Sequence, residues 1–507
     1  MPKRTLVYGT AILVMANLFN RLLGFIYQYL IMAHIGSEAY GLFAMVFPIY
    51  MMAVVLTTAG IPMAVSKLVS EEVSRGNHRQ AKAILKLALG ILSASGALVT
   101  VALYLIVVCI GERFFPDPRA VPVFLICTLA IFIVSVASAF RGYFLGIQNM
   151  LPPALSQVLE QIVRVSCGFG AALYLLPRGI TWAAVGLAVG MLIGEAVGLG
   201  VIMLNYFFAN HPHAGTTCEK TELTGHTLKR IWQFALPVTA GRLLFTGQSA
   251  VDALLIPNRL QTAGCTARQA TTLFGQLGGA GLTLLNFPSV FTFALAASLV
   301  PAIAEAAANN SSQIAKYRSL GAIRVTITLG LPFVVILFSL AEPLTVFFKS
   351  DNIAPVLRIL AVGGIFSYLQ QTTTAILQGL GKAHLPMFHA IAAASVRIPL
   401  LYWLTGLPQW GLLGSAWAFV VGYIIFAILN ITAIVRYTGM SVDLNRLVVQ
   451  PLSASGAMLL VLLLLTPVKG VYLTKYLEGL AVGLIIYFIV LFINRGITIK
   501  DLRRFIH

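Results

Sequence analysis

Residues 141–165 read RGYFLGIQNMLPPALSQVLEQIVRV, and this stretch indicates the fold class because it places two charges inside an apolar segment. Between residues 154 and 176 almost every other side chain is aliphatic, small or aromatic. A charge at the centre of a bilayer costs roughly 2.5 to 3.5 kcal/mol on insertion scales, so it is kept where it has a use. Glu160 and Arg164 therefore indicate that this segment is a membrane span and that its two charges have a structural or functional use.

The composition of the whole chain is that of a membrane protein. Its 507 residues are 59% hydrophobic and 10% charged, whereas soluble domains carry about 25% charged residues. The formal net charge is +18. These charges sit in short connections between apolar runs, which fits anionic lipid headgroups better than nucleic acid. The five cysteines form no CxxC pair, so neither a disulfide framework nor a zinc site is predicted.

Fourteen apolar runs are long enough to cross a bilayer, which takes about 20 residues. The first is read as a retained helix, because Asn17, Asn20 and Arg21 interrupt it and no signal-peptide cleavage site follows. The predicted spans lie near residues 8–33, 41–66, 83–110, 121–145, 155–176, 181–206, 230–256, 271–300, 319–341, 353–379, 386–404, 411–435, 447–467 and 472–494.

The basic residues predict the orientation of these spans. With span ends set to within a few residues, 21 of the 34 lysines and arginines fall on or next to the even-numbered connections and the two ends, 8 on or next to the odd-numbered connections and 5 well inside spans. Positive charge collects on the cytoplasmic side of membrane proteins. The sequence therefore predicts a multi-pass protein of the cytoplasmic membrane with both termini inside.

Two parts of the chain repeat one another. Residues 146–165 align without a gap with residues 379–398, GLGKAHLPMFHAIAAASVRI. Spans one to six and seven to twelve are thus predicted to be two parallel copies of one six-helix unit, an architecture in which transporters place the substrate between the halves. The matched pairs are Gly146 with Gly379, Pro153 with Pro386, Arg164 with Arg397, Gly179 with Gly411, Gly190 with Gly422, Arg21 with Arg242 and Pro62 with Pro301.

The predicted fold class is therefore an all-α polytopic membrane protein of fourteen helices, with two six-helix repeats followed by two further helices. The predicted domains are an N-lobe of residues 1–210, a cytoplasmic linker of residues 211–228, a C-lobe of residues 229–437, and residues 438–507 with the last two spans and a basic tail.

Polar side chains follow one face of the first and seventh spans. Asn17, Arg21 and Gln28 lie at helical spacing, and Arg242 begins a similar face on the seventh span. We expect these faces to line a central cavity. The alternative is that each arginine bonds a carbonyl group at a helix break and only holds the bundle together.

Intramembrane charges give the remaining candidate residues. Glu160 and Arg164 are four residues apart and can pair on one helix face, whereas Arg397 has no acidic partner in its own helix and is a candidate for binding an anion, phosphate above all. Each of three acidic residues could bind a coupling proton or Na⁺, or neutralise an arginine. They are Glu195, Asp252 and Glu305.

No HExxH, Walker loop, GxSxG or paired-carboxylate motif lies on any connection. Hydrolysis and ATP-driven transport are therefore not predicted, and neither an enzyme activity, a cofactor nor a metal is expected.

Three stretches together resemble the stage V sporulation protein B family, in the polysaccharide-transporter branch of the multidrug/oligosaccharidyl-lipid/polysaccharide exporter superfamily. They are RGYFLGIQNMLPPALSQVLEQIVR, NRLLGFIYQYLIMAHIGSEAYGLF and GIPMAVSKLVSEEVSRGN. The resemblance implies a two-lobed, fourteen-helix fold. It also implies a role in moving a lipid-linked peptidoglycan precursor across the cytoplasmic membrane for spore cortex synthesis.

The related lipid II flippases begin with a similar stretch and use several cavity arginines, and Arg21 matches the first of these. The position of their next arginine holds Tyr27 or Gln28 here, and their basic pair in the second helix is absent from FPIYMMAVV.

The leading functional hypothesis is a flippase for an undecaprenyl-pyrophosphate-linked saccharide, most naturally lipid II. Its expected partners are that lipid, anionic membrane lipids, Na⁺ or H⁺, and cell-wall synthases, with no nucleic acid. One alternative is a cation-coupled multidrug exporter of the same superfamily. Such an exporter would need acidic cavity residues to bind cationic drugs. The other is a membrane scaffold for cell-wall synthesis that transports nothing.

Overall fold

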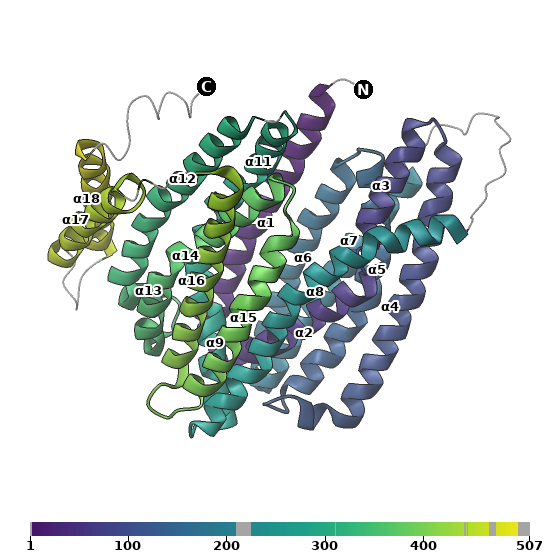
Figure 1. Cartoon of the computed structure of the whole chain (residues 1–507). Helices are drawn as coiled ribbons and strands as arrows, with labels where there is room; N and C mark the ends of the chain where they lie inside the picture. Colours follow the sequence, from purple (N-terminus) through teal and green to yellow (C-terminus); the bar gives the residue numbers. More distant parts are fainter. Residues whose placement is uncertain are drawn as a thin grey trace. The chain divides into compact units, whose positions relative to one another are not determined.

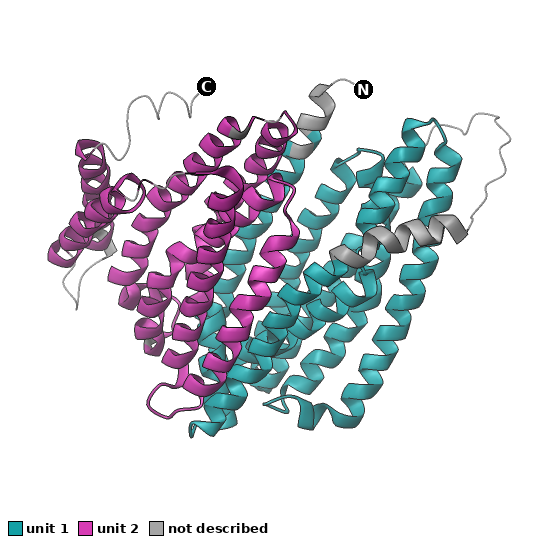
Figure 2. Ribbon diagram, viewed as in Figure 1, with its two compact units in different colours: residues 1–279 teal, residues 280–507 magenta. Residues whose placement is uncertain are grey.

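The computed structural model describes residues 3–208, 225–309, 311–440, 443, 445–465 and 473–494, and all regular elements in these ranges are helices (Figure 1). The predicted all-α membrane fold is thereby confirmed. Contacts between Cα atoms divide the chain into two compact units, residues 1–279 (unit 1) and residues 280–507 (unit 2), which are coloured separately in Figure 2.

Unit 1 is built from long helices whose ends follow local sequence signals. The break before α3 has Ala59 and Gly60 in left-handed conformation, with Pro62 in the first turn of α3. Asn77 caps α4 by accepting a hydrogen bond from the Gln80 backbone N–H at 3.1 Å. The helices are α1 (Lys3–His34), α2 (Ser37–Thr58), α3 (Ile61–Ser74), α4 (His78–Phe114), α5 (Ala120–Gly146), α6 (Leu151–Leu175) with the 3₁₀ turn η1 (Leu176–Arg178), α7 (Ile180–Phe208), α8 (Gly225–Thr262) and α9 (Ala267–Gln276).

The interior of unit 1 is centred on α5 and α7. Helix α5 packs against α2, α3, α4 and α7, and α7 packs in turn against α6. Helices α8 and α9 both pack against α2. The buried side chains between these helices are mainly alanine, valine, leucine and isoleucine, as an apolar helix bundle requires.

Unit 2 repeats part of this arrangement and ends in a helical pair. Helices α17 and α18 pack on each other, and the hydroxyl of Tyr487 on α18 donates to the backbone carbonyl of Thr328 at 2.7 Å. The elements are the π-helical turn η2 (Leu277–Leu282), which crosses the boundary between the units, α10 (Thr283–Asn286), α11 (Ser289–Ala308), α12 (Ser312–Ser339), α13 (Ala341–Phe347), η3 (Asp351–Ile353), α14 (Ala354–Gly379), α15 (His384–Thr405), α16 (Gly411–Thr438), η4 (Asn445–Val449), α17 (Gln450–Leu465) and α18 (Leu473–Ile493).

Helix neighbours within the two units support the predicted repeat. In unit 1, α5 packs against α3, α4 and α7; in unit 2, α14 packs against α11, α12 and α16. The matched glycines also have matched surroundings. A Cβ atom added at Gly146 would lie 2.7 Å from the Cβ of Val69, and one at Gly379 would lie 2.9 Å from the Cβ of Ile303. Both glycines therefore allow the same close approach of two helices.

One predicted match within the repeat is wrong. Pro62 lies in the first turn of α3, whereas Pro301 lies inside α11. The contacts of the matched glycines pair Val69 of α3 with Ile303 of α11. Pro62 lies seven residues before Val69, whereas Pro301 lies two residues before Ile303. The two prolines are therefore not equivalent positions.

The number of spans is the other point of difference. Twelve helices among the described residues are long and apolar enough to cross a membrane, so the predicted count of fourteen is not confirmed. Helices α8 and α14 form, but they are not among the twelve; they carry Arg242, Asp252 and Arg358. The predicted span 271–300 is not one helix, because α9 ends at Gln276 and the helix counted among the twelve, α11, begins at Ser289, with η2 and α10 between them.

The predicted lobes remain a prediction. The predicted linker of residues 211–228 falls largely outside the described residues. Packing assigns α8 and α9 to unit 1, whereas the sequence repeat assigns them to the second copy. A repeat and a packing unit are different properties of a chain, so the two divisions need not coincide.

Candidate functional site

Four charged side chains meet inside unit 1. Arg164 Nη2 donates to Glu160 Oε1 on the same helix and to Glu195 Oε1 on α7, each at 2.6 Å. Arg141 Nη2, from the end of α5, donates to the other oxygen of Glu160, also at 2.6 Å. We call these four residues the buried charge network. With two arginines and two ionised carboxylates, the network is electrically balanced.

The network is shielded from solvent. The glutamate side chains are 11% and 8% exposed and the two arginine side chains 20% each. Tyr27 of α1 and Tyr50 of α2 lie close enough to Arg164 to interact with it electrostatically. Three polar atoms of the network have no hydrogen-bond partner among the described residues, namely Nε of Arg141, Nε of Arg164 and Oε2 of Glu195.

A glycine face on α7 makes this close packing possible. A Cβ atom at Gly198 would lie 3.0 Å from Glu160 Oε2, and one at Gly194 would lie 3.0 Å from the Cβ of Arg164. The hydroxyl of Ser156 donates to the carbonyl oxygen of Gly198 at 2.8 Å. Small residues spaced four apart let helices in a membrane approach closely. The glycine face consists of Gly186, Gly190, Gly194 and Gly198.

The predicted pairing of Glu160 with Arg164 is seen in the structure, but the pair is not isolated. The sequence analysis gave Arg141 no role, and it offered Glu195 either as a site for a coupling ion or as a residue that neutralises an arginine without naming which arginine. Neither shares a helix with the pair, so no spacing rule could have joined them to it. A transport role for these residues stays a prediction.

The polar faces predicted on α1 and α8 are partly accessible in unit 1. Asn17, Arg21 and Arg242 are exposed, whereas Gln28 and Asp252 are half-buried. The Nε2 atom of Gln28 has no hydrogen-bond partner among the described residues. That these two exposed arginines bind an anion stays a prediction.

Arg397 lies in unit 2 and is 6% exposed. Its guanidinium stands 5.1 Å from the ring centroid of Phe419 on α16, a cation–π contact. A Cβ atom at Gly422 would lie 2.7 Å from its Cδ. The sequence foresaw neither contact, and both give this arginine a packing role. Glu305, by contrast, is 70% exposed and 3.6 Å from Arg318.

A second charged cluster lies at the end of unit 1 that holds the α4–α5 connection. Arg119 donates to Asp117 at 2.8 Å and to Glu38 at the start of α2 at 2.7 Å. Glu38 also accepts from Arg268 at 3.0 Å, and the hydroxyl of Thr271 on α9 donates to Asp117 at 2.7 Å. These contacts fasten α9 to α2 and to the α4–α5 connection.

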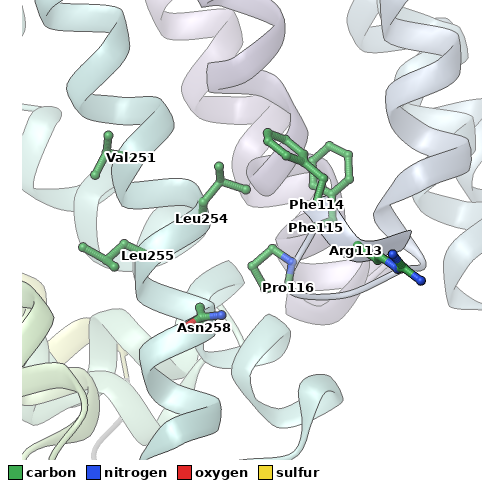
Figure 3. A pocket seen from close by; sticks show the side chains of 8 residues that line it. All are labelled: Arg113, Phe114, Phe115, Pro116, Val251, Leu254, Leu255 and Asn258. Carbon is green, nitrogen blue, oxygen red and sulfur yellow. The ribbon is translucent and has the colours of Figure 1, made fainter. Parts of the chain in front are cut away.

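A pocket of about 370 Å³ lies beside this cluster. Figure 3 shows aromatic side chains of the α4 end on one side and aliphatic side chains of α8 on the other. Polar groups do not converge on it, because the guanidinium of Arg113 points away from α8 (Figure 3). Its lining residues are Arg113, Phe114, Phe115, Pro116, Val251, Leu254, Leu255 and Asn258.

Asp117 makes the stability of this end dependent on pH. Burial disfavours its ionised form, but hydrogen bonds from Arg119 and Thr271 outweigh burial and hold the pKa of Asp117 below its usual value. A carboxyl group with a lowered pKa stabilises the fold above its unfolded-state pKa of about 3.9, and this stabilisation is lost as pH falls through the folded-state pKa. We expect Asp117→Asn to cost about 2 kcal/mol at neutral pH.

The measurement is thermal denaturation of the purified protein and of Asp117→Asn across pH. The two should differ at neutral pH and converge as the pH falls through the folded-state pKa of Asp117. A difference that persists unchanged at acid pH would show that the ionised carboxylate is not the stabilising form.

Comparison with known proteins places the chain among membrane transporters. Residues 6–307 match the family described as Polysaccharide biosynthesis protein, and residues 278–403 match MatE. Stage V sporulation protein B of Bacillus subtilis (strain 168) is 32% identical over 448 residues, which are 88% of this chain and 86% of that protein. The lipid II flippase MurJ of the same organism is 26% identical over 465 residues, covering 86% of this chain and 84% of MurJ.

The solved structures show the same fold. The lipid II flippase MurJ in an inward closed conformation superposes with a TM-score of 0.70 at 16% identity, covering 94% of this chain and 97% of that one.

Proposed function

Because the chain belongs to the polysaccharide biosynthesis protein family, within the multidrug/oligosaccharidyl-lipid/polysaccharide exporter superfamily of membrane transporters, we propose that it is a flippase for a lipid-linked peptidoglycan precursor. The proposed substrate is lipid II, an undecaprenyl-pyrophosphate-linked saccharide, moved across the cytoplasmic membrane for spore cortex synthesis. The names of two relatives, a stage V sporulation protein and a lipid II flippase, support this substrate and this process.

One structural observation carries the proposal, namely that two arginines of unit 1 are accessible within its helices while the buried glutamates of unit 1 are paired with arginines. Arg21 on α1 and Arg242 on α8 are exposed, while the two glutamates of the buried charge network are paired with arginines. A pyrophosphate group would compensate the accessible arginines, and guanidinium groups bind phosphate in a bidentate manner. A cationic drug would find no matching carboxylate at these two positions.

The proposed mechanism is alternating access. Within unit 1 the pyrophosphate would be held by Arg21 and Arg242, with Asn17 and Gln28 offering hydrogen bonds to the saccharide, while the lipid tail stays in the bilayer. The proposed orientation has both termini in the cytoplasm, which places the basic excess next to anionic lipid headgroups. H⁺ or Na⁺ would bind during the cycle as an ion coupled to substrate binding.

Flipping of fluorescently labelled lipid II by the purified protein in liposomes tests the proposal. We expect movement of lipid II and no movement of cationic dyes. Export of dyes without lipid II movement would identify a multidrug exporter. A protein that moves neither compound but binds a cell-wall synthase would be a scaffold.

Alanine at Arg21 or Arg242 should reduce lipid II binding about tenfold or more. Each substitution removes charge-assisted hydrogen bonds worth roughly 1.5 to 3 kcal/mol. Lysine should retain part of the activity, because it keeps the charge but cannot bind phosphate in a bidentate manner. Binding and flipping of labelled lipid II are measured at equal protein abundance.

Arg178→Ala is the matched control, because Arg178 lies in η1 at the end of a span and stands 5.9 Å from the ring of Tyr174. It should flip lipid II at the rate of the unaltered protein. Fully active Arg21→Ala and Arg242→Ala variants would contradict the proposed pyrophosphate site.

A further inference from the structure

One carboxylate oxygen of the buried charge network accepts no hydrogen bond from its arginines. Both oxygens of Glu160 accept a hydrogen bond, one from Arg141 and one from Arg164. Glu195 accepts through Oε1 alone, and its Oε2 has no partner among the described residues. The Glu195 side chain is only 8% exposed, so water does not freely solvate the remaining oxygen.

The helices around α7 determine what Glu195 faces. Helix α6 brings Arg164 and Glu160, α5 brings Arg141, and α2 brings Tyr50. Two positive charges, one other negative charge and a phenol thus surround this carboxylate. Both carboxylates accept a hydrogen bond from the same nitrogen, Arg164 Nη2, so the two negative charges are held close together.

Two carboxylates that share one buried site are costly to keep ionised together, and such pairs commonly hold a proton. Taking up one proton at Oε2 would turn that oxygen into a hydroxyl donor and remove one negative charge. The network would change from balanced to a net charge of plus one. Glu160 is the less suitable acceptor of the proton because an arginine already occupies each of its oxygens.

We propose that Glu195 is a proton-binding site whose protonation releases Arg164 to bind a phosphate group of the substrate. In the deprotonated state, two carboxylates pair with Arg164, so its guanidinium cannot bind an anion. In the protonated state, the hold of Glu195 on Arg164 is weakened and one positive charge is uncompensated. Proton and anion therefore bind cooperatively, and each raises the affinity for the other by the same factor.

This inference rests on the proposed function, because it takes an anionic lipid-linked substrate as given. It adds that H⁺ is the ion coupled to that substrate and that Glu195 is where it binds. It also makes Arg164 a substrate ligand only in the protonated state, which explains why a balanced network is retained inside the membrane.

Binding of a short polyprenyl pyrophosphate, geranylgeranyl pyrophosphate, to the full-length protein in detergent tests the inference by calorimetry. The affinity of the unaltered protein should rise roughly tenfold as pH falls from about 8 to about 5.5, relative to Glu195→Gln at each pH. Binding at neutral pH should also take up protons, seen as a dependence of the heat on the ionisation enthalpy of the buffer. Since the probe itself titrates, the comparison with Glu195→Gln separates the protein's protons from those of the probe.

Glu195→Gln resembles the protonated state, so it should bind the probe more tightly than the unaltered protein at high pH and about equally at low pH. Glu305→Gln is the matched control, since Glu305 is an exposed carboxylate in the other unit, and it should keep the unaltered pH profile. Equal pH profiles of the unaltered protein and Glu195→Gln would overturn the inference. If Glu195→Gln does not fold, proton uptake by the unaltered protein decides alone, and no uptake beyond that of the probe overturns the inference.

Measuring both lipid II flipping and proton-linked probe binding distinguishes a failure of this inference from a failure of the proposed function. Lipid II flipping without proton-linked probe binding would refute the proton site and leave the flippase intact. Proton-linked binding of the probe without lipid II flipping would refute the proposed substrate and leave the proton site intact.

Discussion

Replacing Glu160 with glutamine is expected to destabilise the folded protein by about 3 kcal/mol or more, because it strands buried charge. Glu160 accepts from both arginines of the buried charge network, at 2.6 Å each. A glutamine keeps one carbonyl oxygen for one guanidinium and turns an NH₂ donor toward the other. The measurement is thermal denaturation in detergent together with the abundance of membrane-inserted protein.

The choice of second substitution sharpens this prediction. Adding Arg141→Gln to Glu160→Gln leaves the contact between Arg164 and Glu195 intact, so much of the lost stability should return. Adding Arg164→Gln instead leaves both Arg141 and Glu195 without their charged partners, so less should return. The reverse order of rescue would contradict the network as described.

Glu305→Gln serves as the control again, because its pairing with Arg318 is long and exposed and exposed pairs contribute about 0 to 1 kcal/mol. Its melting temperature should stay close to that of the unaltered protein. An equal loss in Glu305→Gln and Glu160→Gln would mean that burial of the network does not determine the effect.

Only part of the buried charge network could be predicted from the sequence. The pairing of Glu160 with Arg164 was predictable, because residues four apart share a helix face. Arg141 and Glu195 reach the same site from two other helices, and apolar periodicity contains no information about which helices are neighbours. The pair predicted from the sequence is therefore only part of the network.

The helices themselves were more predictable than the breaks between them. Length and hydropathy locate a span, and the turns at Gly60 and before Pro152 carry ordinary helix-breaking signals. The π-helical turn Leu277–Leu282 was missed because its sequence, LGGAGL, is as apolar as a span. Glycines there lower helix propensity without adding any polarity, so a hydropathy criterion reads the turn as part of a helix.

Among glycine-to-alanine substitutions, Gly275→Ala should destabilise the folded protein most, by about 3 kcal/mol or more. Its Cβ would lie 1.9 Å from the carbonyl oxygen of Ser37, and a Cβ at Gly41 would lie 2.1 Å from the carbonyl oxygen of Thr271. Backbone atoms cannot rotate away as side chains can, so α2 and α9 would have to separate. Gly247→Ala is the control, since nothing lies within 4 Å of its added Cβ, and it should be neutral or stabilising.

The double variant decides whether these two glycines form one contact. If α2 and α9 cross with their backbones touching, the helices separated by Gly275→Ala have already made room at Gly41, and the second alanine should add little. Thermal denaturation of both single variants and the double variant measures this coupling. Additive losses would mean that the two glycines act independently. The small residues at Ser37, Gly41, Thr271 and Gly275 are visible in the sequence, but small-residue spacing indicates only that a helix packs closely, and its partner follows from the fold.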